Sequence, residues 1–200
     1  MNAASDDSVA VGAGGRPGEP LRSPEAIRTD RLVLVPMSTA VVRSILRQDW
    51  AEARRLLGTE FPPEWREDGW RWLEPQAERG ERDDRYIAWG TRLAFATGQG
   101  PSRVRGAVLA EVGFHGPPDT EGGAEIGYRV VARYQRQGLA EEAAWALLRW
   151  AYAHGVSDVR ACVSPDNAPS MGLLYKLGFT EAGHHQHSIL GEQLVFRRRF

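Results

Sequence analysis

The middle of the chain changes its hydrophobic period from that of a strand to that of a helix. Glu125–Val131 has the β-branched and aromatic content of a strand. Leu139–His154 instead repeats apolar residues at helical spacing and stops at Gly155. The pattern therefore predicts a strand, a tight turn and a long helix in immediate succession.

A strand and two short helices are predicted before this unit. Leu32–Val35 is an apolar run typical of a buried first strand. Ser38 or Thr39 is a suitable N-cap for the helix that follows. A second helix is predicted for Trp50–Leu57, because Gly58 suits its end.

The other periodic segments predict further strands and helices of one α/β (α+β) domain. They are a helix from Glu67 to Arg79, two strands of a hairpin at Tyr86–Ala96 and Val104–Phe114, a strand at Val159–Val163, a helix from Ala168 to Leu177 ended by Gly178, and a last hairpin from His184 to Phe196. Residues 1–26 are rich in Gly, Pro, Ser and Asp without periodicity, which predicts a disordered tail before a domain spanning 27–200.

Composition narrows the class of protein. The formal net charge of −1 argues against nucleic acid or an anionic membrane as the main partner. A single cysteine, Cys162, excludes an intrachain disulfide and a zinc site built from cysteines. No apolar run is long enough to span a bilayer, and the first residues lack a secretory pattern, so we expect a cytoplasmic protein, either a monomer or a homodimer.

The turn between the central strand and the long helix, Gln135–Ala140, is a candidate phosphate site. Gly138 and the small Ala140 let a ligand approach the backbone, and the start of a helix offers N–H groups without acceptors to an anion. Plain helix capping by Gly138 is the structural alternative. No Walker lysine accompanies this turn, and the G-x-G-x-x-G turn of dinucleotide-binding folds is absent.

Two further motifs point to a known family. Asn167-x-x-Ser170 is followed by Leu177-Gly178-Phe179, Thr29–Leu32 opens the fold, and Glu125–Tyr128 marks the central strand. Over residues 27–200 the chain thus resembles the GCN5-related N-acetyltransferases (GNAT), and within them the branch of the ribosomal-protein N-terminal acetyltransferases. The resemblance implies a mixed, mostly antiparallel twisted sheet whose central strands splay apart, flanked by helices.

The resemblance also implies acetyl-CoA as co-substrate and a primary amine as acceptor, either a protein N-terminus or a small molecule. Asn167 would lie beside the cofactor. The pantetheine arm would run along Tyr128, Arg129 and Val130, and the pyrophosphate would lie on Arg136, Gln137, Gly138, Leu139, Ala140 and Glu141.

Proton transfer in this family often uses a tyrosine seven residues after the asparagine, and Leu174 stands there. Tyr175 would point about 100° further round the helix. Ser170, where the similar branch is thought to stabilise the leaving thiolate, is therefore the expected partner of the thiolate; a first-turn serine that satisfies helix N–H groups is the alternative. Glu125 is the expected general base, with Glu111 on the neighbouring strand as a second candidate.

Other residues leave alternatives open. The aromatics of Phe61–Trp65 form either the wall of the acceptor pocket, with help from the His184–His187 hairpin, or part of the core. The histidines predict no metal site, because a strand places His185 and His187 on one face and His184 on the other. Because Leu174 stands where the family often has a tyrosine, the chain could also be a non-catalytic acyl-CoA-binding module of the same fold; this second interpretation stays open.

Overall fold

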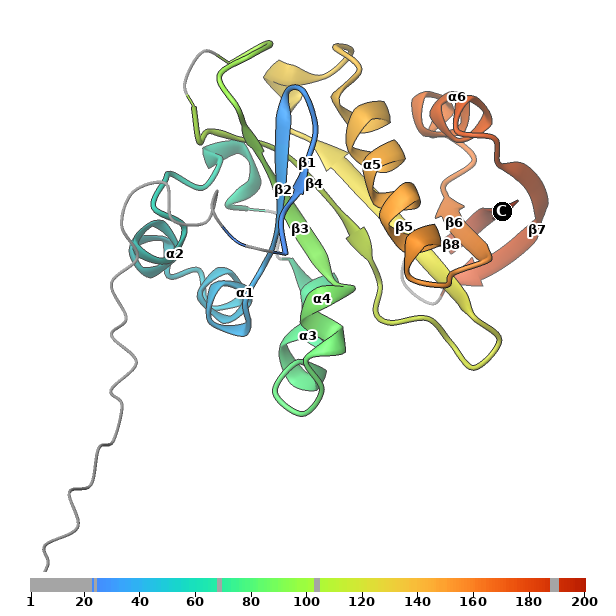
Figure 1. Ribbon diagram of the computed structural model, residues 1–200, viewed down its shortest axis with the longest axis horizontal. Coiled ribbons are helices and arrows are strands. Elements are labelled where there is room, and N and C mark those ends of the chain that lie inside the picture. Colours follow the sequence, from blue (N-terminus) through green and yellow to red (C-terminus); the bar gives the residue numbers. More distant parts are fainter. Residues whose placement is uncertain (1–22, 24, 68–69, 103–104, 188–190) are drawn as a thin grey trace, which may run out of the picture.

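An eight-stranded sheet with the order β1-β2-β3-β4-β5-β6-β8-β7 organises the computed structural model (Figure 1). The structure describes residues 23, 25–67, 70–102, 105–187 and 191–200. The strands are β1 (Ile27–Arg28), β2 (Leu32–Pro36), β3 (Thr91–Ala96), β4 (Val108–Phe114), β5 (Gly123–Val130), β6 (Asp158–Val163), β7 (Thr180–His187) and β8 (Gly191–Arg199). The helices are α1 (Thr39–Leu46), α2 (Trp50–Leu57), α3 (Glu74–Arg79), α4 (Arg85–Ala88), α5 (Leu139–Ala153) and α6 (Ala168–Lys176), with 3-10 turns η2 (Pro63–Trp65), η3 (Arg71–Leu73) and η4 (Ala132–Tyr134).

Neighbouring strands pair antiparallel except for β5 and β6, which are parallel. This confirms the predicted mixed, mostly antiparallel sheet. The parallel pairing covers Gly123–Glu125 against Asp158–Arg160 and then stops. Beyond that point β5 continues to Val130 beside β4, and β6 continues to Val163 beside β8. The two central strands therefore separate, as the sequence resemblance implies.

Helices cover both faces of the sheet. In β2, Leu32 and Leu34 pack into one core and the alternate Val33 and Val35 into another, as the period of two in a strand requires. Helix α5 fills the first core with its buried alanines and leucines, and α1 and α2 fill the second. Figure 1 shows α5 across the middle strands, α6 beside the β6–β8 half, and α1 and α2 near the β1–β2 edge.

Capping residues place the helices where the sequence predicts them. The Ser38 hydroxyl accepts from the Val41 N–H and begins α1, which decides between the two candidate caps. Helix α2 has the predicted bounds, and Gly58 ends it with φ of 66°. Gly178, after α6, has φ of 80°, the left-handed conformation that favours glycine.

The helix predicted from Glu67 to Arg79 is wrong in its first half, as far as the described residues go. Trp70 has φ of 51°, which is incompatible with a continuous right-handed helix, and only η3 and the short α3 follow it. The ring of Trp70 is buried, and its Nε1–H donates to the Trp65 carbonyl at 2.7 Å. Tertiary packing of this indole outweighs the helical pattern around it.

The strand predicted from Tyr86 begins only at Thr91, because residues 85–88 form α4. Buried Arg92 holds this turn, since its Nη2 donates to the Ala88 carbonyl at 2.6 Å. Burial lowers the pKa of Arg92 to about 10, and the Trp150 ring lies 4.8 Å from its guanidinium. The partner strand likewise begins at Val108 and not at position 104, which lies outside the described residues.

Phe61 and Trp65 belong to the core and not to an open pocket wall. Their exposed fractions are 1% and 4%, and Phe61 packs on Trp50, Trp65 and Trp70 with ring centroids 5.1–6.1 Å apart. Of the two roles that the sequence allows for these aromatics, the structure therefore supports core packing, because the rings complete the hydrophobic layer under α1 and α2.

The predicted tail, residues 1–26, lies almost wholly outside the described residues. Among the helices of the described chain, none is both long and apolar enough to cross a membrane.

We predict that Trp65→Ala lowers the free energy of unfolding by about 3 to 5 kcal/mol, the usual cost of deleting a buried indole. Trp72→Ala is the matched control, because the Trp72 side chain is 45% exposed and its removal should cost much less. Urea titrations of both variants check this, and an equal loss in the two would contradict the placement of Trp65 in the core.

Candidate active site

A cleft of about 310 Å³ lies where β5 and β6 separate. Its floor comes from the two strands and its wall from α6. The lining residues are Ile126, Tyr128, Ala161, Cys162, Val163, Ser164, Asn167, Ser170, Leu174 and Gln193. Tyr128, Asn167 and Ser170, three residues expected from the sequence, therefore meet in one cleft.

Two hydroxyl groups face each other in this cleft. Tyr128 reaches from β5 to α6, where its hydroxyl oxygen lies 2.9 Å from the Ser170 Oγ. Burial raises the pKa of Tyr128, although the hydrogen bond with Ser170 works in the opposite direction. The Asn167 side chain caps α6 by accepting the Ser170 N–H at 3.1 Å. Because Asn167 performs the capping, the Ser170 hydroxyl is directed to Tyr128 and not to helix N–H groups.

Leu174, at the usual tyrosine position, and its neighbour Tyr175 have different surroundings. Leu174 is buried in the core under α5 and α6. Tyr175 is exposed on the outer surface of α6, where its ring packs edge-on against Phe196 at 5.3 Å. Tyr175 is not among the residues that line the cleft, which agrees with its predicted helical offset.

The turn before α5 has the backbone geometry of an anion site. Arg136 and Gly138 have φ of 59° and 75°, so two left-handed residues stand within three positions. Such alternation directs N–H groups toward a common point. Within the described chain, the N–H groups of Leu139, Ala140 and Glu141 have no acceptor, as expected for the first turn of a helix.

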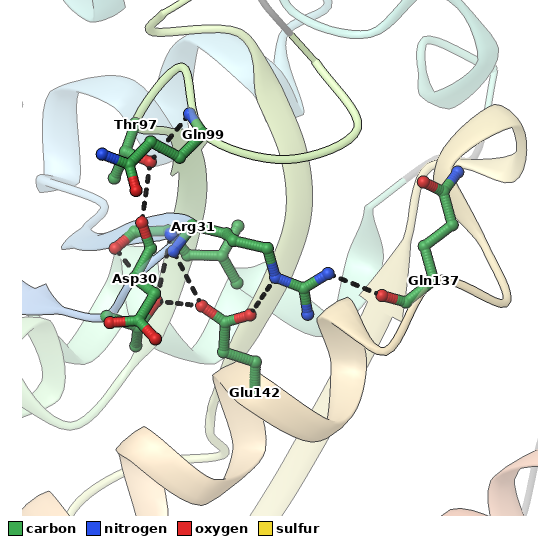
Figure 2. A network of polar contacts seen from close by, with 8 residues as sticks. Asp30, Arg31, Thr97, Gln99, Gln137 and Glu142 are labelled. Atoms are coloured by element: carbon green, nitrogen blue, oxygen red, sulfur yellow. Dashed lines mark hydrogen bonds and ion pairs between the residues drawn. The ribbon is translucent and has the colours of Figure 1, made fainter.

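Arg31 holds this turn in place, a contact that the sequence analysis did not predict (Figure 2). Its Nε donates to Glu142 at 2.5 Å and its Nη1 donates to the Gln137 carbonyl at 2.8 Å. Thr29 donates to the other oxygen of Glu142 at 2.5 Å. Burial raises the pKa of Glu142, but the hydrogen bonds from Thr29 and Arg31 lower it overall.

The side chain of Arg129 points away from the cleft. It lies on the α1–α2 face, with its guanidinium 4.4, 4.5 and 5.1 Å from the rings of Trp65, Trp70 and Trp72. Its Nε is 3.2 Å from the buried Glu111 carboxylate on β4. Only the backbone of Arg129 is therefore available to line a pantetheine arm, and Glu111 is engaged by this arginine.

Glu125 lies on the same face as Arg129, at the point where β5 and β6 separate. Its Oε1 is 3.2 Å from the His115 Nδ1. Hydrogen bonds from His115 first and then from the Cys162 thiol lower the pKa of Glu125, although burial acts against them. Burial and the Glu125 charge together raise the pKa of Cys162 to about 11, so this thiol stays protonated and acts as a donor.

The histidines of the terminal hairpin do not converge on one point among the described residues. Rings of His185 and His187 lie 6.2 Å apart, whereas His184 pairs with Glu192 at 3.1 Å, which agrees with the predicted division between two faces. In the part of the chain that the structure describes, no group of three His, Cys, Asp or Glu residues could hold a metal ion.

Residues 31–180 match the family described as the acetyltransferase (GNAT) domain. The chain belongs to this GNAT family. A curated relative, the uncharacterized N-acetyltransferase YoaA of Bacillus subtilis (strain 168), is 34% identical over 103 residues, which make up 51% of this chain and 53% of YoaA. The chain thus aligns with about half the length of this relative.

Solved structures show the same GNAT fold over nearly the whole chain. The ribosomal-protein-S5-alanine acetyltransferase of Vibrio fischeri covers 87% of this chain and 96% of its own, with a TM-score of 0.58 and 14% identity. RimJ of Mycobacterium smegmatis, in complex with CoA-disulfide, covers 92% of this chain and 90% of its own, with a TM-score of 0.55 and 19% identity. The expected likeness to the ribosomal-protein branch is confirmed at the level of fold.

We predict that Glu142→Gln lowers the melting temperature of this GNAT domain at neutral pH, because it removes the carboxylate that Arg31 and Thr29 hold. The folded-state pKa of Glu142 is lowered from its ordinary value of 4.5. Its stabilising contribution is therefore fully present above that value and is lost as the pH falls through the folded-state pKa.

Melting curves of wild type and Glu142→Gln between pH 7 and pH 4 check this prediction. The control is Glu52→Gln, which removes an exposed pair with Arg55 at 2.6 Å and should change little. A gap between wild type and Glu142→Gln that stays constant into acid would contradict the role of the carboxylate.

Proposed function

We propose that the protein transfers the acetyl group of acetyl-CoA to a primary amine. The single observation that carries this proposal is the cleft between the separating strands, which is lined by the hydrogen-bonded hydroxyls of Tyr128 and Ser170. An open strand edge suits the amide groups of pantetheine, and two hydroxyls in the same cleft suit a thiolate that needs a proton.

The cofactor contacts divide between two regions. Pantetheine would run along β5, beside the Tyr128 and Val130 side chains and the Arg129 backbone, with Asn167 at its flank. The pyrophosphate would lie on the N–H groups of the turn and of the first residues of α5, namely Arg136, Gln137, Gly138, Leu139, Ala140 and Glu141. The positive end of the α5 dipole and the Arg136 side chain favour an anion there.

A pair of hydroxyls takes the place of the family's usual tyrosine in this proposal. Leu174 occupies the usual position and is buried, whereas the Tyr128 hydroxyl reaches Ser170 from the neighbouring strand. The acetyl transfer forms a C–N bond and breaks the C–S bond. Ser170 would donate its proton to the leaving thiolate, Tyr128 would supply a replacement, and water would return a proton to Tyr128. The substrate oxyanion needs an N–H donor from β5, which has its open edge at this point.

A non-catalytic acyl-CoA-binding module is the alternative. It requires only the turn before α5 and the open edge of β5. The Ser170–Tyr128 pair and the polar cluster around Glu125 favour catalysis, because a module that only binds CoA needs neither. The acceptor is a protein N-terminus or a small-molecule amine, and cytoplasmic localisation stays a prediction.

We predict that acetyl-CoA raises the melting temperature of the protein, whereas NAD and ATP do not. Gly138→Val should abolish the rise, because a branched side chain would occupy the proposed pyrophosphate position. Gly155→Val, at the other end of α5, is the matched control: Gly155 has φ of 86°, close to 75° for Gly138, and open space around it. Both variants carry backbone strain, but only Gly138→Val should lose the response, and an intact response there would rule out this pyrophosphate site.

We also predict that Ser170→Ala lowers turnover by about ten- to a hundredfold, which reaches the lower end of what one proton-transfer partner usually contributes. Tyr128→Phe should lower turnover as well, whereas Tyr175→Phe should have little effect, because its ring packs outside the cleft. Release of free thiol from acetyl-CoA over a library of primary amines measures this. Equal turnover in Ser170→Ala and Tyr175→Phe would disprove the assignment. If the wild type releases no thiol with any amine of the library, the binding module is favoured.

A further inference from the structure

His115 lies over the strand that carries the proposed reaction, on the face opposite to α5. It follows β4, and its N–H donates to the Glu125 carbonyl at 2.9 Å. Ala124 and Ile126 pack under α5, so the alternate Glu125 and Gly127 face the other side. The imidazole covers these two residues at the point where β5 leaves β6.

Gly127 makes room for this imidazole. A Cβ added at Gly127 would lie 3.1 Å from the His115 Nε2, closer than side chains normally approach. The backbone of Gly127 needs no left-handed conformation, so space is the reason for a glycine here. The Nε2 is thus held directly above the strand, while the ring is still 59% exposed to an approaching substrate.

The surroundings of the ring decide which nitrogen can act as a base. The Glu125 carboxylate on β5 accepts from Nδ1, and it is held in place by the Cys162 thiol of β6. Arg160, also on β6, adds a positive charge near Glu125 and pairs with Asp119. With its proton on Nδ1, the neutral imidazole carries its lone pair on Nε2, the nitrogen above Gly127.

We propose that His115 is the general base that takes the proton of the acceptor ammonium, and that Glu125 is a positioning residue that orients the imidazole. This assignment rests on the proposed acetyltransferase function. It places the acid and the base on opposite faces of the sheet: Ser170 and Tyr128 on the α6 side, and His115 on the other. The acceptor then enters from the face opposite to the leaving thiol.

The proton and bond changes balance. Nε2 takes one proton from the ammonium, and the freed amine forms a C–N bond with the thioester carbonyl. Nε2 passes this proton to water and then takes the second proton of the nitrogen as the C–S bond breaks, while the thiolate gains one proton through Ser170. The imidazolium returns its proton to water.

The test compares His115→Ala, Glu125→Gln and the control His154→Ala in thiol release with the amines that the wild type accepts. His154 is also an exposed histidine, but it lies at the far end of α5. At pH 7 we expect His115→Ala to lose about a hundredfold in kcat/KM, within the range for general-base catalysis. We expect Glu125→Gln to lose about tenfold and His154→Ala to match the wild type.

Two readouts separate a base from a structural role. Added imidazole should restore the rate of His115→Ala, and the loss should shrink as the pH rises above the pKa of the acceptor ammonium, because the amine is then already neutral. The rise in melting temperature with acetyl-CoA should be unchanged. Wild-type kcat/KM in His115→Ala, or a loss equal at all pH values without rescue, would overturn the assignment.

The remaining outcomes are also decisive. If Glu125→Gln loses more than His115→Ala, and imidazole does not rescue the alanine variant, then Glu125 is itself the base, as the sequence predicts. If the wild type binds acetyl-CoA but releases no thiol with any amine, the proposed transferase function fails, and the role of His115 fails with it.

Discussion

Strands β5 and β6 share only three parallel residue pairs before they separate, and each part of the candidate site is placed relative to that separation. The opening is stable because each strand keeps its other neighbour: β5 stays paired with β4, and β6 with β8. An open edge in the middle of a sheet, and not at its rim, gives a ligand backbone groups to bind while the core on either side stays intact. The alternation of a strand then assigns different chemistry to the two faces. Tyr128 reaches Ser170 on one face, and Glu125 holds His115 on the other.

The turn before α5 depends on a contact with the first part of the fold. Thr29 and Arg31 both precede β2, and both bind Glu142 in the first turn of α5. A carboxylate at this position interacts favourably with the positive end of the helix dipole, but its negative charge would repel a pyrophosphate. Arg31 neutralises that charge and also donates a hydrogen bond to the Gln137 carbonyl at 2.8 Å. Because this carbonyl is bound on the Arg31 side, the N–H groups of the turn stay available to a ligand. The family motif at residues 29–32 thus has a physical role in shaping the turn before α5.

Local patterns predicted those parts of the structure that local forces decide. The caps at Ser38 and Gly58, the helix after Gly138 and the end of α6 at Gly178 all follow from residues within one turn of each other. The errors occur where distant packing decides. Buried Trp70 interrupts the helix expected from residue 67, and the Arg31–Glu142 pair joins residues 111 positions apart, so no periodicity could reveal it. The position of His115 over Gly127 was missed for a similar reason, because the register of two strands brings them together. A glycine in a strand was the one available signal of a close approach.

Amide hydrogen exchange with and without acetyl-CoA tests the central claim most directly, because it reports on backbone groups and does not need a known acceptor. The account predicts that acetyl-CoA slows exchange at residues 126–130 on β5 and at residues 136–141 in the turn and first residues of α5. Exchange in β2 and β3, which are already fully paired within the sheet, should stay the same. Protection that appears elsewhere while residues 126–130 exchange at their free rate would contradict the claim that the cofactor binds between the separating strands.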